Sequence, residues 1–424
     1  MNIESPGDQE ERSQAVAGAT AAIVSDEPEV PEEAQKTGGW SLRDLVRGDL
    51  GQLPVFIGLV VIASGFEIWT GGTFLSSENL TNLADQVVSV PVLGLGIAAA
   101  LVLLIGEIDL SLSAVAYFCG AVTGVLSVHH GWSAVQAMLA GIVVGMTIGL
   151  INGVCVAVLR MPSFIVTLAG FIFYQGALSH ILQPQTTLQI FDPTIAGISN
   201  YVLPTYLGIL LPAVILAVYA AGILTERARR QQAGLPVQPL AQVALQVGVP
   251  AVLVAVVIAV FDTYQGVPLP TVITMAIILI FWLITTKTSF GRHIYAVGGN
   301  AEAARRAGIN VVGLRIAIFT LASTIAAVCG LLIDSRSVSA AAQVNQYLLL
   351  FAIAGAVIGG VSLFGGRGSM WGVVIGALVV GTLYNGLALL NVGPDVVLMA
   401  AGLVLLIAVL IDAVARRRSV TGYR

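Results

Sequence analysis

Two carboxylates interrupt a long apolar stretch in the first third of the sequence. Gly106–Ser111 reads G-E-I-D-L-S and carries Glu107 and Asp109. Ionisable groups at membrane depth are costly and are functional candidates by default. The favoured interpretation is a tight turn between two helices, in which Asp109 is the N-cap of the second helix and Ser111 helps to satisfy its free N–H groups. Direct contact with a ligand stays open, whereas a proton relay is weaker because no second intramembrane carboxylate or histidine continues it.

A second candidate site lies in the most charged segment between apolar stretches, Lys287–Arg315. Within it, Asn300–Gly308 reads N-A-E-A-A-R-R-A-G, and Glu302 would favour the first turn of a short helix because it complements the helix dipole. Small residues leave a low-relief face that the groove of a partner could accept: Ala303, Ala304, Ala307 and Gly308. The alternative is an ordinary basic loop beside the membrane, and the spacing alone leaves both interpretations open.

Neutral polar residues inside the apolar segments are a weaker set of candidates. Each is better explained by an interhelical hydrogen bond than by a ligand contact: Asn152, Thr167, Gln175, Asn385 and Asn391. The cysteines lie far apart inside apolar segments and resemble buried small hydrophobes rather than disulfides or metal ligands: Cys119, Cys155 and Cys329. The sequence therefore predicts no metal site and no catalytic residue.

The glycine-rich segment Ile358–Ser369 resembles a phosphate-binding loop only superficially. It lacks the pattern G-x-x-x-x-G-K-[ST], and neither Lys36 nor Lys287 follows a glycine. No bound cofactor is expected on this chain, and any ATP-driven step must be carried out by a different polypeptide.

The composition decides which elements must position these residues. The 424 residues are 57% hydrophobic and only 10% charged, with a mean hydropathy of +0.93. Soluble domains carry roughly 25% charged residues, so this chain cannot cover a water-facing surface. Continuous apolar runs of about 20 residues predict helices that cross a bilayer rather than the alternating strands of a barrel.

The predicted fold is all-α and polytopic, with about twelve transmembrane helices. The expected spans are 50–69, 84–105, 109–128, 134–158, 163–182, 204–224, 243–262, 269–286, 311–333, 347–363, 371–390 and 395–414. Glycines recur every four residues in two of these spans and predict close helix packing inside the chain rather than dimerisation: Gly141, Gly145, Gly149 and Gly153, and then Gly372 and Gly376.

Charge predicts the orientation and the domain limits. Residues 1–38 hold nine acidic residues against Arg12 and Lys36, a net charge of −7, and are expected to be a disordered cytoplasmic tail ahead of a membrane domain at 39–424. Basic residues concentrate on one side of the predicted spans, where Arg160 and the Lys287–Arg315 segment lie, and only Arg336 falls on the other side. The positive-inside rule therefore predicts that both termini are cytoplasmic.

Four segments together resemble a known family. They read G-E-I-D-L-S, P-S-F-I-V-T-L-A-G, S-F-G-R-H-I-Y-A-V-G-G-N-A-E-A-A-R-R-A-G-I-N and G-G-V-S-L-F-G-G-R-G-S. In order and spacing they are similar to signatures of the permease subunits of bacterial monosaccharide ABC importers, within the branched-chain amino-acid permease superfamily. The resemblance covers residues 50–415. Glu107, where many relatives have glycine, and an extra pair of spans at 204–262 resemble the xylose permease in particular.

The resemblance implies a type II ABC importer-like permease in the bacterial cytoplasmic (inner) membrane. Its implied partners are a cytoplasmic ATPase with two nucleotide sites, which binds ATP and Mg²⁺, an extracytoplasmic sugar-binding protein, and a second copy of the permease. Residues 287–310 would form the loop that couples to the ATPase. The implied coupling residues are Arg292, Glu302, Ala303, Ala304 and Gly308. The implied motif or pathway residues are Glu107, Asp109, Ser111, Asn152, Thr167 and Asn385.

Three other interpretations stay open at this point. A stand-alone secondary transporter would also have about twelve spans, but it needs an ionisable site for its coupling ion. An ABC permease for a nucleoside, an autoinducer or an amino acid fits the same motifs. A membrane scaffold that transports nothing is the third.

Overall fold

The structure is a computed structural model, and it is described here for residues 53–410 except for a few positions. The exceptions are 89–91, 236, 238, 264–265, 394, 398, 401, 405 and 408. The predicted acidic tail at 1–38 and the basic residues at both ends of the chain, Arg43, Arg47 and Arg416–Arg418, lie outside the described residues.

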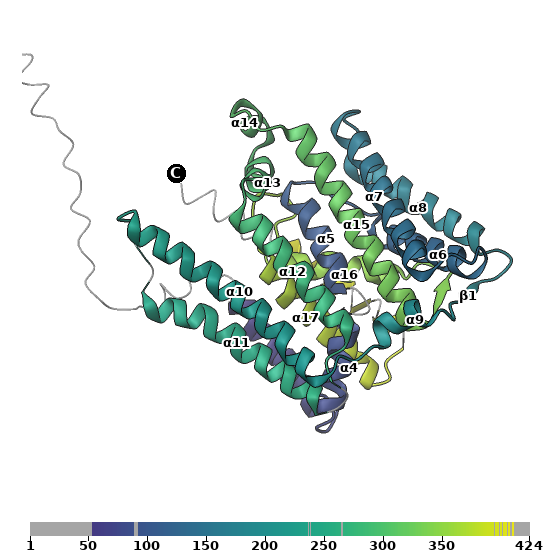
Figure 1. Ribbon diagram of the computed structural model, residues 1–424, viewed down its shortest axis with the longest axis horizontal. Helices are drawn as coiled ribbons and strands as arrows, with labels where there is room; N and C mark the ends of the chain where they lie inside the picture. Colours follow the sequence, from purple (N-terminus) through teal and green to yellow (C-terminus); the bar gives the residue numbers. More distant parts are fainter. Residues whose placement is uncertain are drawn as a thin grey trace, which may run out of the picture. The chain divides into compact units, whose positions relative to one another are not determined.

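Almost all of the described chain is helical, so the predicted all-α class is confirmed (Figure 1). The helices are α3 (Leu53–Trp69), α4 (Ser77–Val88), α5 (Val92–Leu104), α6 (Leu112–Val128), α7 (Ala134–Ala157), α8 (Ser163–Leu182), α9 (Pro193–Asn200), α10 (Thr205–Gln232), α11 (Leu240–Asp262), α12 (Leu269–Lys287), α13 (Ser289–Gly299), α14 (Ala301–Arg306), α15 (Val311–Ser337), α16 (Gln346–Ile358) and α17 (Met370–Leu389). Two short strands, β1 (Thr187–Gln189) and β2 (Ser339–Ala341), pair antiparallel with Leu188 opposite Ala340.

Seven helices among the described residues are long and apolar enough to cross a membrane, and four shorter apolar helices accompany them. The polytopic membrane fold is therefore confirmed, while the count of twelve spans stays a prediction. In lipid, backbone N–H and C=O groups must be satisfied within the segment, which is why apolar runs of this length become helices.

Several predicted boundaries differ from the observed ones. The predicted span 347–363 ends at Ile358, because Gly360 takes a positive φ of 88° that closes the helix. The span predicted at 204–224 continues to Gln232 as α10, since an exposed ion pair between Glu226 and Arg230 supports its last turns. Three short helices, α9, α13 and α14, lie outside every predicted span.

Helix α5 is the centre of the fold. All thirteen of its residues are buried, and it is apolar on every side, as expected for a helix that other helices surround. It packs against α4, α6, α12, α13, α15, α16 and α17 (Figure 1). A movement of α5 would therefore affect half of the other helices listed above.

The glycine strip of α7 packs closely against α15, as the four-residue spacing predicts. A Cβ atom added at Gly149 would lie 2.5 Å from the carbonyl oxygen of Phe319, and one at Gly153 would lie 2.8 Å from the Cα of Ile316. Helices α16 and α17 meet in the same way, since a Cβ atom at Gly376 would lie 1.8 Å from the carbonyl oxygen of Gly355. Glycine here allows backbones to approach and gain van der Waals contact.

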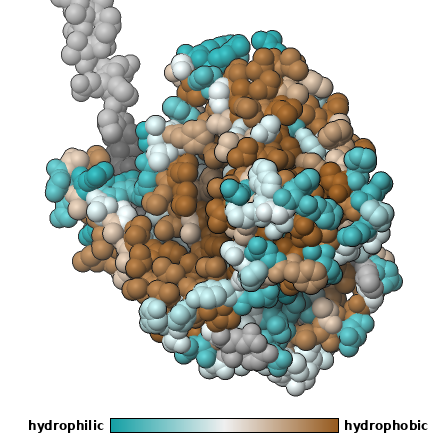
Figure 2. Space-filling view, turned by 45° about the vertical axis from the view of Figure 1, so that its right-hand side comes forward, coloured by the Kyte–Doolittle hydropathy of each residue, from teal (hydrophilic) through white to brown (hydrophobic). Residues whose placement is uncertain are grey.

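Large apolar side chains are exposed along the outer faces of α7 and α8. Leu150 is 47% exposed and Phe173 is 69% exposed, values that suit contact with lipid rather than with water. Figure 2 shows apolar side chains over much of the upper and left parts of the visible face, with hydrophilic residues at the top and across the centre, right and bottom. Apolar surface of this extent suits contact with a membrane.

The glycine packing leads to a testable prediction about stability. We expect Gly149→Ala to lower the melting temperature of the detergent-solubilised protein, because the new methyl group overlaps the α15 backbone and overpacking costs about 1–3 kcal/mol. Thermal stability followed by size-exclusion chromatography would measure this. Gly176→Ala in α8 is the matched control, since nothing lies within 4 Å of its added Cβ. An equal melting temperature for both variants would contradict the packing.

Candidate functional site

Helices α13 and α14 join α12 to α15 at one end of the bundle, at the top of Figure 1. Local capping forms both helices. The Thr288 hydroxyl accepts a hydrogen bond from the N–H of Gly291 at 3.2 Å, and the Asn300 side chain accepts one from the N–H of Ala303 at 2.9 Å. These caps satisfy backbone groups that each short helix leaves unpaired. The predicted charged segment is thus a pair of ordered helices.

Helix α14 presents charge and small side chains on its exposed face. Glu302 forms ion pairs with Arg305 at 2.8 Å and with Arg306 at 3.3 Å, and all three side chains are at least half exposed. Ala303 and Gly308 are also exposed, and Gly308 ends the helix with a φ of 85°. The exposed face of α14 therefore retains most of the small-residue pattern predicted for docking.

Ala304 departs from that pattern. Its side chain is only 5% exposed, so it belongs to the packing of α14 and not to the exposed face. The reason is the helical period, because Ala303 and Ala304 are adjacent in sequence and point to different sides of a helix. Arg292 on α13 is exposed, close to the caps that begin that helix.

Helix α13 is seated directly on the end of α5. A Cβ atom at Gly298 would lie 1.8 Å from the carbonyl oxygen of Leu104 and 2.5 Å from the backbone nitrogen of Gly366. The N–H of Gly366 donates a hydrogen bond to that same carbonyl of Leu104 at 2.9 Å. The Tyr295 hydroxyl donates to the carbonyl of Gly368 at 3.0 Å, and burial raises the pKa of Tyr295. Backbone groups of the glycine-rich segment after α16 therefore contact both the end of α5 and helix α13.

The two carboxylates of the G-E-I-D-L-S segment have different environments. Glu107 forms an ion pair with Arg315 at 2.9 Å, and their side chains are 15% and 29% exposed. Arg315 lies near the start of α15, where the helix dipole disfavours a cation, so the carboxylate compensates for this placement. The ion pair joins the α5–α6 connection to α15.

Asp109 is buried in the α5–α6 connection. Its Oδ1 atom accepts hydrogen bonds from the backbone N–H of Ser111 at 2.8 Å and from the Ser111 hydroxyl at 2.6 Å. The prediction that Asp109 is the N-cap of the next helix is wrong by two residues, because Ser111 holds that position and Asp109 closes a turn before it. Burial raises the pKa of Asp109 to about 6, although both hydrogen bonds from Ser111 oppose this shift.

Helices α7 and α8 hold the same connection from the other side. The hydroxyl oxygen of Ser163 accepts a hydrogen bond from the N–H of Ile108 at 3.2 Å, and that of Thr167 accepts one from the N–H of Leu110 at 3.0 Å. The Asn152 amide donates to the Ser111 hydroxyl at 3.3 Å. Backbone groups that no helix pairs are thereby satisfied inside the protein. All four sequence motifs therefore meet at the end of the bundle that carries α13 and α14.

An open cleft of about 490 Å³ lies beside these motifs. It runs between the α7–α8 turn, α14 and the start of α15. Its charged lining residues are Glu107, Arg160, Glu302, Arg305 and Arg315. The cleft is large enough for side chains of another protein and offers charges of both signs.

Asn385 lies apart from this group, on α17 in a set of amides with two α4 residues. Its Oδ1 atom accepts a hydrogen bond from the Asn79 amide at 2.9 Å, and its own amide donates to Oε1 of Gln86 at 3.2 Å. Asn79 was missed because α4 begins ahead of the predicted span 84–105, and Gln86, which lies inside that span, was not among the polar candidates. The signal that was present is the mixed polar and apolar composition of residues 77–88.

Asp334 is a second residue that the sequence analysis missed. The predicted span 311–333 stopped just before it, whereas α15 continues to Ser337 and buries Asp334 to 2% exposure. It lies beside Gly120 of α6, where an added Cβ would come 2.4 Å from its Oδ2 atom. The spans thus contain a buried carboxylate that was not anticipated.

The seating of α13 gives the second prediction. We expect Gly298→Ala to loosen α13 and α14, because a methyl group cannot fit against the carbonyl of Leu104. Hydrogen–deuterium exchange across residues 289–306 should rise several-fold in this variant. Gly299→Ala is the neighbouring control, since nothing lies within 4 Å of its added Cβ. Equal exchange in both variants would contradict the seating.

Comparison with known proteins gives consistent matches. Residues 80–409 match the family described as branched-chain amino acid transport system, permease component. The xylose transport system permease protein of Escherichia coli (strain K12) is 34% identical over 369 residues, covering 87% of this chain and 93% of the relative. The fructose import permease protein of Rhizobium meliloti is 30% identical over 376 residues, covering 89% of each.

Another relative has a higher sequence identity over a shorter part of the chain. The ribose import permease protein of Bacillus subtilis (strain 168) is 43% identical over 149 residues, or 35% of this chain and 46% of the relative. No solved structure matches this chain. The family predicted from the four motifs is confirmed, and these relatives are named as permeases rather than enzymes. With its bundle of apolar helices, the chain belongs to the family of multi-pass membrane proteins that serve as permease components of branched-chain amino acid-type transport systems.

Proposed function

We propose that this protein is the transmembrane permease of an ATP-driven importer for a monosaccharide, with D-xylose or a similar pentose as the substrate. The observation that carries the proposal is the similarity to the xylose transport system permease over 87% of the chain, together with the convergence of all four motifs around α13. Glu107 and the α10–α11 pair support the pentose assignment.

The partners follow from the proposed function. A cytoplasmic ATPase with two nucleotide sites would bind ATP and Mg²⁺ and dock on α13, α14 and the cleft beside them. An extracytoplasmic sugar-binding protein would deliver the substrate to the opposite end, where α4 and α9 lie (Figure 1). A second copy of the chain would complete the permease as a homodimer.

The distribution of arginines supports this orientation. Arg160, Arg292, Arg305, Arg306 and Arg315 lie in or near α13, α14 and the adjoining turns, whereas Arg336 at the opposite end forms an ion pair with Asp85. Cytoplasmic segments of membrane proteins carry an excess of Lys and Arg. We therefore propose that the end with α13 and α14 faces the cytoplasm; the prediction that both termini are cytoplasmic belongs to the same proposal.

The contacts indicate how a pull on α13 and α14 would reach the spans. Gly298 of α13 packs closely against the last carbonyl group of α5. The Glu107–Arg315 ion pair connects the α5–α6 turn to α15. Displacement of α13 by the ATPase would therefore move α5 and α15 together. In alternating access, such a movement changes which side of the membrane the pathway faces, and the permease itself breaks no covalent bond.

The rival function, a stand-alone secondary transporter, is strengthened by one observation. Asp334 is buried in α15, and no partner for its Oδ2 atom occurs within the described residues. Buried carboxylates in spans commonly carry protons in such transporters. Against it stands the convergence of the four motifs on an exposed pair of short helices, which a stand-alone transporter does not need.

The proposed docking gives the third prediction. We expect Glu302→Lys to reduce xylose uptake and the stimulation of ATPase activity at least fivefold while leaving membrane insertion intact. Its ion pairs with Arg305 and Arg306 are exposed, so they contribute little to stability. Radiolabelled uptake and phosphate release in proteoliposomes would measure both activities.

A charge reversal elsewhere serves as the control. Arg230 on α10 also forms an exposed ion pair, with Glu226 on the same helix. Arg230→Glu reverses a surface charge outside the proposed coupling segment 287–310 and should keep uptake near the wild-type rate. If Glu302→Lys retains full uptake and ATPase coupling, docking on α14 is wrong.

A pull-down tests the proposed function as a whole. Mild solubilisation of host membranes and mass spectrometry should recover this chain with an ATPase that carries two P-loop domains. Recovery of this chain alone, under conditions that keep other ABC importers assembled, would favour the secondary transporter and overturn the proposal.

A further inference from the structure

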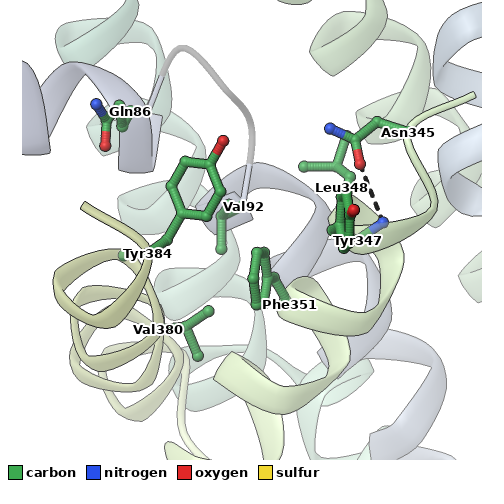
Figure 3. A pocket seen from close by; sticks show the side chains of 9 residues that line it. Gln86, Val92, Asn345, Tyr347, Leu348, Phe351, Val380 and Tyr384 are labelled. Atoms are coloured by element: carbon green, nitrogen blue, oxygen red, sulfur yellow. Dashed lines mark hydrogen bonds between the residues drawn. The ribbon is translucent and has the colours of Figure 1, made fainter. Parts of the chain in front are cut away.

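A small pocket lies between α4, α5, α16 and α17, at the end of the bundle opposite α13 and α14 (Figures 1 and 3). Its lining consists of Gln86, Val92, Asn345, Tyr347, Leu348, Phe351, Val380, Gly381 and Tyr384. None of these side chains is charged. The polar members lie around an apolar floor, so the pocket offers both kinds of contact to one ligand.

The amide oxygens of Gln86 and Asn345 both accept hydrogen bonds, while their NH₂ groups are not used by these bonds. Oε1 of Gln86 accepts from Asn385, which in turn accepts from Asn79. Oδ1 of Asn345 accepts the N–H of Tyr347 at 3.0 Å and so caps α16. Each amide carries one acceptor oxygen and one NH₂ group with two donors. With its oxygen engaged, Asn345 keeps both N–H donors of its amide unused among the described residues, and Figure 3 shows this nitrogen on the side nearer to Tyr384.

Three aromatic rings form one wall. Tyr347 and Phe351 stack with ring centroids 6.4 Å apart, and Phe351 meets Tyr384 edge to face at 5.7 Å. Figure 3 shows the Tyr384 hydroxyl directed towards the space between Gln86 and Asn345. Within the described part of the chain this hydroxyl has no hydrogen-bond partner. It can therefore both donate to and accept from a ligand.

The chemistry of this lining matches a neutral polyhydroxylated molecule. Aromatic faces suit the C–H surface of a sugar ring, while amide donors and hydroxyl groups suit its oxygens. A charged solute would find no counter-ion among the lining residues. From this geometry we infer that the pocket contacts the monosaccharide during its passage, an inference that rests on the proposed function.

The pocket is closed to a sugar in this structure. Its volume is about 30 Å³, whereas a cavity that binds one benzene molecule measures roughly 150 Å³. A monosaccharide is larger than benzene, so the helices that line the pocket must separate before it can enter. Movement of α5 provides the connection, because Val92 of the pocket lies at the start of α5 and Leu104 under α13 lies at its end.

Three substitutions change the chemistry of the pocket while preserving its packing. Tyr347→Phe and Tyr384→Phe remove a hydroxyl and keep the ring. Asn345→Asp keeps an oxygen that can cap α16 and removes the NH₂ donors. Tyr206→Phe on α10, where the side chain is 68% exposed, is the matched control.

The experiment compares sugar uptake with ATP hydrolysis in proteoliposomes that hold the complete importer and its loaded binding protein. For each pocket variant we expect a three- to tenfold lower ratio of xylose imported to ATP hydrolysed, the scale of one lost hydrogen bond. A purely structural defect would lower both activities together and leave the ratio unchanged. The control should match the wild type.

Two other outcomes separate the pocket from the function on which it depends. If all three variants take up xylose at the wild-type rate with an unchanged ratio of xylose imported to ATP hydrolysed, the pocket does not contact the sugar. The proposed importer function would still stand. Failure of the assembled wild-type complex to import any monosaccharide would overturn the proposed function, and the sugar assignment of the pocket with it.

Discussion

The carbonyl group that ends α5 is the point on which much of this structure depends. A buried helix end leaves carbonyl groups without intrahelical partners, and in a membrane protein no water is available to satisfy them. Here the N–H of Gly366 pairs with Leu104, and Gly298 allows α13 to lie directly against the same group. Because α5 is buried on every side, this one backbone contact connects an exposed pair of helices to the centre of the bundle. Glycine at both positions is what makes the approach possible.

Polar side chains also satisfy buried hydrogen-bonding groups at both ends of the bundle. At the end with α13 and α14, hydroxyl groups of Ser163 and Thr167 accept the N–H groups of the α5–α6 connection. At the other end, Asn385 is held between two α4 amides beside a small pocket. The first set is structural, since its members are engaged with backbone or with one another. The second leaves donors unused, which is why it is the better candidate for contact with a sugar.

Sequence reasoning was accurate where a residue acts through its own short segment. Glu302 lies in the first turn of a short helix, Gly308 follows its end, and the glycines of α7 face a neighbouring helix, as predicted. The local cap of α6 was misplaced by two residues, since Ser111 and not Asp109 holds it. Where packing against another segment decides, the predictions were wrong or incomplete: Ala304 is not on the exposed face, and Asp334 lies inside α15, beyond the predicted end of its span. The exposed or buried side of a short helix depends on what packs against it.

The sequence by itself determined the class of the protein, most of its long helices and its family. Long apolar runs can satisfy their backbones in lipid only as helices, and each of the four motifs is a continuous segment of sequence. Tertiary structure alone decided that these motifs meet around one end of α5, that Asn385 lies apart from them and bonds to two α4 amides, and that Glu107 pairs with Arg315. The physical reason is that most spans are apolar on all sides. Such helices carry no stripe that marks the buried face, so their neighbours are chosen by the fit of glycines and by rare polar contacts between residues far apart in the chain.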